Sequence, residues 1–295
     1  MNKPATQAEA AKNPNTAGKI SQKEIDRVLE GGVVIPPRPE ILTQIEEMAR
    51  NEDIDLRSVA QLISKDVGLS AAVFRLAGSP VFGLRKKPAT IEQAIPVLGL
   101  RQTTSIIRSE SLRKAVSGAS YPKAYAALWD RFNEIGLLTA IITDSLKIRS
   151  ISPEQAFTAG MFCDCGIPIL MNKLPGYCAA LKQNDALNWP AIPEEDDKHN
   201  TSHTVVGHLV ARNWKLPDLI TEAIRDHHDV ENASPGTRQL IAALQFALRI
   251  HDLINRRDGS EWYAHREFVL TQLDIAESEE KEIAEEAMEQ FHYAS

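Results

Sequence analysis

The sequence has few cysteines and no long hydrophobic run. Three cysteines among 295 residues cannot form a disulfide framework and are typical of a reducing compartment. The most apolar stretches, such as residues 135–142, are far shorter than the roughly 20 residues that a membrane span needs. The polar amino terminus lacks the apolar core of a signal peptide. We therefore expect a cytoplasmic protein with no membrane partner.

Basic residues do not predominate either. Lys and Arg number 33 against 40 Asp and Glu, which gives a net charge of −7 and excludes a general nucleic-acid binder. The basic loop Arg85-Lys86-Lys87 is the exception, and we interpret it as a candidate partner-binding segment. A plain solvated loop is the alternative for this segment. The sequence also has no glycine-rich phosphate loop and no G-x-S-x-G nucleophile motif.

Strand patterns are missing, because no window alternates apolar and polar residues over a sustained length. Apolar residues recur instead at helical spacing, as in Ile41, Leu42 and Ile45. Helix starts are indicated at Asp55, at Thr90 to Gln93 and at Ser152 to Gln155, and Gly68 to Ser70 is expected to separate two helices. The fold class is therefore predicted to be all-α, with one long helix over about residues 121–148.

The predicted domain organisation has three parts. Residues 1–32 are expected to form a disordered tail, because nothing in them demands burial. Residues 33–258 are expected to form one helical module with two lobes, about 33–117 and 118–258, and residues 259–295 an acidic helical extension. A stripe of apolar residues on the acidic helix could contact a partner, although packing on its own domain is the alternative.

Candidate ligands for a metal gather in the second half of the chain. A helical bundle can bring such side chains together from different helices, although histidines near helix ends are often ordinary surface or capping residues. The spacing of five predicts that His203 and His208 point in different directions. Adjacent His227 and His228 are expected to splay apart, which makes chelation of one ion by both awkward without help from the helix end. The candidates are Cys163, Asp164, Cys165, His203, His208, His227, His228, Asp229, His251 and Asp252.

Several motifs together resemble the HDOD domain, the output-domain branch of the HD metal-dependent phosphohydrolase superfamily. The amino-terminal motifs are residues 35–39, 59–69, 74–79 and 91–100. The segment 156–166 resembles the helix and His-Asp loop of the superfamily, and residues 203–207, 214–217 and 223–229 complete a resemblance over about 32–257. The resemblance implies an HD-like bundle of many helices in two lobes.

The departures from the superfamily pattern matter for activity. The resemblance places one metal-binding histidine at about Ile135 and another at Cys163, while Asp164 is kept and Asp252 matches the last aspartate. A thiol and an alkyl chain in place of two imidazoles make a poor site for activating water. His203, His227 and His228 match further histidines of two-metal relatives. We therefore expect no catalytic residues and no cofactor, while a half-site with Asp164 leaves room for a residual divalent metal.

Three functional hypotheses follow from the resemblance. The first, which we favour, is a pseudoenzyme that acts as a regulatory scaffold in bacterial signal transduction, in circuits related to cyclic-di-GMP, through contact with signalling proteins in trans. The second is a metal-dependent phosphohydrolase with a degenerate site. The third is a non-catalytic module whose histidine-lined pocket senses a small nucleotide. The residues available to the second hypothesis are Cys163, Asp164, His203, His228 and Asp252.

Overall fold

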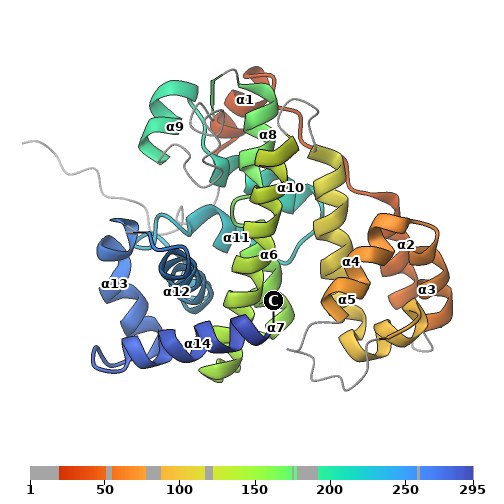
Figure 1. Cartoon of the computed structure of the whole chain (residues 1–295). Helices are drawn as coiled ribbons and strands as arrows, with labels where there is room; N and C mark the ends of the chain where they lie inside the picture. The colour runs from red at the N-terminus through yellow and green to blue at the C-terminus, as the bar shows by residue number, and fades with distance from the viewer. Residues whose placement is uncertain are drawn as a thin grey trace, which may run out of the picture.

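The computed structural model describes residues 20–50, 55–77, 88–116, 122–174, 176–177, 192–257 and 260–294. Every regular element in these ranges is a helix, which confirms the predicted all-α fold (Figure 1). Among the described helices, none combines the length and the apolar character of a membrane-crossing segment. The helices are α1 Gln22–Glu30, α2 Glu40–Ala49, α3 Leu56–Ser64, α4 Val67–Ala77, α5 Ile91–Val116, α6 Pro122–Ser145, α7 Pro153–Phe162, α8 Gly166–Lys173, α9 Ile192–His199, α10 His203–Asn213, α11 Asp218–Asp226, α12 Arg238–Ile254, α13 Ser260–Leu273 and α14 Glu280–Ala294.

The helices form two groups that share α5. In the first group, α3 packs against α2 and α4, and all three helices pack against α5, on the right of Figure 1. In the second, the long helix α6 packs against α7, α12 and α14, and α10 packs against α8 and α11. Helix α5 also contacts α7 and α8, so it joins the two groups. The main hydrophobic core runs through both groups without interruption.

Local sequence signals explain where several helices begin. Ser152 and Gln155 form a complete capping box at the start of α7, with Pro153 at the first helical position, as predicted. Asp55 caps α3 through the backbone N–H of Arg57. The predicted break at Gly68 to Ser70 is wrong, because α3 and α4 separate at Lys65 and Asp66, and Gly68 lies inside α4. The Asp66 carboxylate accepts the N–H groups of Gly68 and Leu69, so it caps α4.

The amino-terminal segment is a second correction. Residues 20–32 were expected to be part of a disordered tail, but they include α1, which begins with a capping box between Ser21 and Glu24. Val28 of α1 is 1% exposed, and the helix packs against α10. The sequence could not show this burial, because it depends on a surface of α10 that is nearly 180 residues away. Residues 1–19 lie outside the described part of the chain.

Glycines allow close approaches between the helices that hold the candidate ligands. A Cβ on Gly160 of α7 would lie 2.7 Å from the Cα of Gly136 on α6. A Cβ on Gly166 at the start of α8 would lie only 2.1 Å from the backbone oxygen of His203. Because real Cβ atoms do not come so close to backbone oxygens, only glycine lets α8 pack here against the first turn of α10. These contacts fix His203 relative to the 163–165 turn.

Candidate functional site: a histidine and aspartate cluster

Four predicted ligands come together where α7, α10 and α11 meet. Asp164 lies in the turn between α7 and α8, His203 is the first residue of α10, and His227 and His228 directly follow α11. One ligand atom from each of the four residues lies within 4.8 Å of all the others. Asp164, His203 and His227 are buried, and His228 is partly buried. These four residues are called the histidine cluster below.

The end of α11 explains how both His227 and His228 belong to the cluster. Neighbouring residues within a helix point in directions that differ by about 100°. However, α11 ends at Asp226, and His228 is already part of the following turn. The two imidazole rings lie with centroids 4.0 Å apart and planes inclined by 42°. Both rings can therefore face the same point.

The second nitrogen of each imidazole determines which nitrogen faces the cluster. Nδ1 of His203 lies 2.8 Å from the Glu195 carboxylate, and Nδ1 of His228 contacts the Glu261 carboxylate. Nδ1 of His227 lies 2.8 Å from the backbone oxygen of Ile224. Ionised carboxylates and carbonyl oxygens only accept hydrogen bonds, so each Nδ1 carries the proton. In the neutral imidazoles, each Nε2 therefore presents a lone pair to the cluster.

These lone pairs are close together and lack donors. Nε2 of His203 lies 3.2 Å from Nε2 of His228 and 3.4 Å from Oδ1 of Asp164. Nε2 of His227 lies 3.6 Å from the same oxygen, which is too long for a hydrogen bond, and this buried nitrogen has no hydrogen-bond partner. A cluster of acceptors at such distances requires either bound protons or a cation between them.

The donor set fits one divalent transition metal ion. Ligands about 2.0–2.2 Å from a tetrahedral zinc ion are separated from one another by about 3.3–3.6 Å, close to the three separations of 3.2, 3.4 and 3.6 Å given above. Each histidine also has the acceptor on its outer nitrogen that metal-bound histidines usually have. With neutral imidazoles, the charges of Asp164, Glu195 and Glu261 against Arg131 sum to −2, which one divalent cation would balance. Such an ion would act as a Lewis acid on a bound oxygen.

Arg131 of α6 controls the charge of Asp164. Its Nη1 contacts Oδ2 of Asp164, so Oδ1 remains free to face the histidines. Burial alone would raise the pKa of the Asp164 carboxyl, but Arg131 and the neighbouring imidazoles hold this pKa well below its usual value. Burial and the neighbouring His228 lower the pKa of His227. The aspartate is therefore ionised and His227 neutral near neutral pH, as metal binding requires.

The other predicted ligands lie away from this arrangement. Cys163 is fully buried in a small apolar cluster with Ile135 and Leu244, and its Sγ lies 3.2 Å from the backbone oxygen of Gly160. Burial and the nearby charge of Asp164 raise the pKa of the Cys163 thiol, so it stays protonated. Asp252 of α12 does not belong to the histidine cluster. Its neighbour His251 contacts Glu134 at 3.0 Å instead.

Sequence reasoning missed the three charged residues that support the cluster. Arg131, Glu195 and Glu261 lie on α6, α9 and α13, outside the sequence motifs named above. Nothing in their local sequence distinguishes them from other charged helix residues. Glu195 is the exception in burial, because it is fully buried beside the Tyr177 hydroxyl, which donates to it. Only the tertiary structure shows what these charges contact.

Two further features lie elsewhere. The predicted partner-binding residues Arg85, Lys86 and Lys87 lie outside the described residues.

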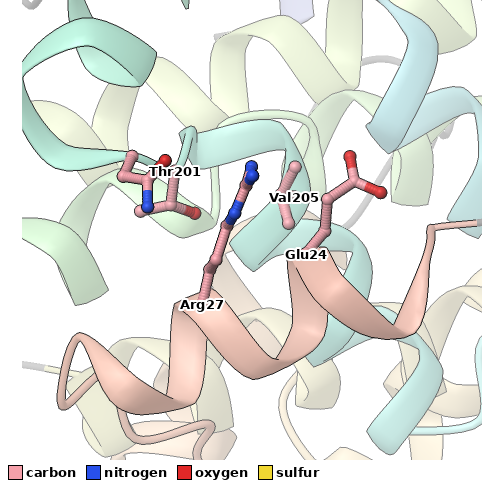
Figure 2. Close-up of a pocket in the computed structure, with 5 residues that line it drawn as sticks. Glu24, Arg27, Thr201 and Val205 are labelled. Atoms are coloured by element: carbon pink, nitrogen blue, oxygen red, sulfur yellow. The ribbon is translucent and has the colours of Figure 1, made fainter.

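A cavity of about 240 Å³ lies between α1 and the start of α10 (Figure 2). Arg27 and Glu24 of α1 project towards Thr201 and Val205 there, and Asn200 completes the lining. None of the four residues of the histidine cluster lines this cavity.

Comparison with known proteins places this geometry in a family context. The model of the HDOD domain matches residues 35–230. A proposed phosphohydrolase from Shewanella amazonensis is 21% identical, with a TM-score of 0.68 over 92% of this chain and 97% of that one. An HDOD domain protein of unknown function from Geobacter sulfurreducens is 22% identical, with a TM-score of 0.61 over 91% of this chain and 98% of that one. These structures share the fold.

Two more relatives extend beyond this chain. A proposed signal transduction protein from Marinobacter aquaeolei is 19% identical, with a TM-score of 0.62 over 94% of this chain and 60% of that one. An uncharacterised protein from Treponema pallidum is 23% identical over 230 residues, which are 78% of this chain. The chain spans only 44% of the length of that curated relative.

Proposed function

Because the chain belongs to the HDOD domain family, as the match over residues 35–230 shows, we propose that it is a non-hydrolytic regulatory protein of bacterial signal transduction. In this proposal the histidine cluster binds one divalent transition metal ion as a structural or regulatory centre. The protein then acts through contacts with signalling proteins in trans. The HDOD family and the relative described as a proposed signal transduction protein support the regulatory part.

One observation carries the non-hydrolytic part of the proposal. Ile135 and Cys163 stand where the superfamily resemblance implies two metal-binding histidines, and in this structure they pack together with Leu244. All three side chains are 0% exposed, and none of them offers the imidazole nitrogen that a second ion would need. Metal-assisted hydrolysis of phosphate esters commonly uses two metals about 3.5–4 Å apart that clamp the attacking and leaving oxygens. A single ion beside an apolar cluster lacks this clamp.

The geometry of the retained half supports binding of one ion. Three imidazoles present Nε2 lone pairs, and Oδ1 of Asp164 faces two of them at 3.4 and 3.6 Å. The expectation from the sequence was no metal, with a residual divalent ion allowed, whereas this geometry favours one bound ion. The sequence could count the candidate ligands but could not show that the outer nitrogens of all three histidines are held by acceptors.

Metal stoichiometry and turnover test this proposal together. We expect the protein, loaded with Zn²⁺ or Co²⁺ and desalted, to hold one ion per chain by elemental analysis. His227→Ala should lower the amount bound at least tenfold, because it removes the donor whose Nε2 is buried without a partner. The matched control is His292→Ala, since His292 is an exposed histidine on α14. The same loaded samples should show no turnover of phosphate monoesters, nucleotides or cyclic dinucleotides.

The outcomes separate the parts of the proposal. Two ions per chain, or turnover that disappears with Asp164→Ala, would refute the non-hydrolytic function and favour the phosphohydrolase hypothesis. An absence of stoichiometric metal would refute the one-ion half-site. A thermal shift with cyclic dinucleotides, which a ligand specific for the folded state must produce, would favour the nucleotide-sensing hypothesis.

A further inference from the structure

Glu261 connects the histidine cluster to a part of the chain that lies outside the family match. The HDOD match ends at residue 230, whereas Glu261 lies in the first turn of α13. Its carboxylate contacts Nδ1 of His228, and the same oxygen lies 3.4 Å from Nε2 of His265 on the next turn of α13. The residues after the family domain therefore supply a direct contact to one of the four predicted ligands.

Glu261 is held in place by the packing of α13 on α12. The adjacent Trp262 is 4% exposed and stacks on Phe246 of α12, with ring centroids 5.7 Å apart. The guanidinium of Arg249 lies over the same indole ring at 6.0 Å. Helix α14 packs in turn on α12 and α6 with Ala284, Ala287 and Phe291 buried. Helices α13 and α14, called the C-terminal pair below, thus form an ordered support for Glu261.

His228 depends on this support more than the other two histidines do. The side chain of His228 is 22% exposed, while those of His203 and His227 are 2% and 0% exposed. The outer nitrogens of His203 and His227 are held by Glu195 and by the Ile224 carbonyl, both near them in sequence. His228 reaches its acceptor 33 residues away. A partly exposed imidazole whose Nδ1 has no fixed partner would rotate, and its Nε2 would no longer face the cluster.

We propose that the C-terminal pair is a metal-linked element of this protein, in which Glu261 acts as a positioning residue for His228. The inference rests on the one-ion half-site proposed above. A carboxylate on Nδ1–H fixes the ring, selects the Nε2 lone pair and makes that nitrogen a stronger ligand. Ion binding at the cluster and docking of the C-terminal pair are then two coupled equilibria, and such coupling is reciprocal. Docking raises the affinity for the ion by a certain factor, and a bound ion raises the docking equilibrium constant by the same factor. A regulatory protein can use such a link to display or withdraw a helical surface.

Two substitutions at Glu261 test the positioning role with the full chain. Glu261→Gln keeps an oxygen acceptor for His228 but removes the charge, and Glu261→Ala removes both. Glu267→Gln is the matched control, since Glu267 is an exposed glutamate on the same helix. Titration with Co²⁺, followed by its visible absorption bands, gives both the affinity and the coordination geometry. Hydrogen exchange of α13 amides, with and without Zn²⁺, reports the docking of the C-terminal pair.

The expected result is a graded loss at Glu261 alone. Removing the partner of a metal-bound histidine typically costs 10- to 100-fold in metal affinity, so Glu261→Ala should fall in this range and Glu261→Gln between it and wild type. Zn²⁺ should slow exchange of the α13 amides in wild type and in Glu267→Gln, and this slowing should be lost in Glu261→Ala. Far-ultraviolet circular dichroism checks that all variants are folded.

The contrary results are distinct. If wild type binds one ion, but Glu261→Ala binds Co²⁺ within twofold of wild type with an unchanged spectrum, the positioning role is refuted while the half-site stands. If Zn²⁺ leaves α13 exchange unchanged in a wild-type protein that binds it, the link to the C-terminal pair is refuted. If wild type binds no ion, both the half-site and this inference fall.

Discussion

Replacing Gly166 with alanine tests how closely α8 must approach α10 to form the histidine cluster. The new Cβ would lie 2.1 Å from the backbone oxygen of His203, 2.8 Å from its carbonyl carbon and 2.9 Å from its Cα. All three atoms belong to the backbone, so no flexible side chain can move out of the way. The first turn of α10 would have to move from α8 by about 1 Å, judged from the 3.0 Å below which real Cβ contacts essentially never occur.

The loss of stability in Gly166→Ala should lie at the upper end of the range that is typical when a group is added to a packed core. Inserting a methyl group into a well-packed core costs about 1–3 kcal/mol, and the cost is larger when the backbone must shift. We therefore expect the free energy of unfolding to fall by about 3 kcal/mol. The shift also moves His203 relative to Asp164, whose Oδ1 lies 3.4 Å from Nε2 of His203, so metal affinity should fall at least tenfold.

Urea unfolding followed by circular dichroism measures the stability, and Co²⁺ titration measures the affinity. Gly236→Ala is the control, because a Cβ at Gly236 meets nothing within 4 Å. It should change the free energy of unfolding by no more than about 0.5 kcal/mol. If Gly166→Ala were as stable as the control and bound metal as wild type does, the close approach of α8 and α10 could not be what positions His203.

Two further predictions concern the charges around the cluster. Arg131→Met removes the partner of Asp164, and the Asp164 side chain is only 4% exposed, so in metal-free protein at neutral pH we expect the free energy of unfolding in urea to fall by about 3 kcal/mol. Arg149→Met, at an exposed arginine, is the control. Equal stability of the two variants would contradict the pairing of Arg131 with Asp164. Burial lowers the pKa of His208, so the unfolded state gains its proton at a higher pH than the folded state does, and as the pH falls below about 6.5 this group lowers the stability by up to about 1.4 kcal/mol per pH unit. His208→Gln should flatten the dependence of the unfolding free energy between pH 7 and pH 5, and an unchanged slope would show that folding does not lower the pKa of His208.

Local signals in the sequence predicted much of the fold. Capping residues act within three positions of one another, so the capping box at Ser152 and the cap at Asp55 are readable without tertiary structure. Apolar spacing likewise predicted the long helix that became α6. The sequence failed at α1, whose burial needs a partner helix far along the chain, and at Gly68, where a capping aspartate and not the glycine separates the helices.

The residue types at the candidate site were determined by the sequence alone. It contains Asp164, His203, His227 and His228, and it has an alkyl side chain and a thiol at Ile135 and Cys163. Only the tertiary structure decided which of these groups meet. It brought the four ligands within 4.8 Å, left Asp252 out, and enclosed Cys163 with Ile135 and Leu244.

The tertiary structure alone also decided the electrostatics of the site. Arg131, Glu195 and Glu261 come from three different helices, and their effect on the cluster depends on distances of a few ångströms in a buried environment. Helical periodicity governs neighbours along one helix and carries no information about which helices cross. The sequence therefore determines which residue types are present, whereas the packing of the helices determines which charges and ligands come together.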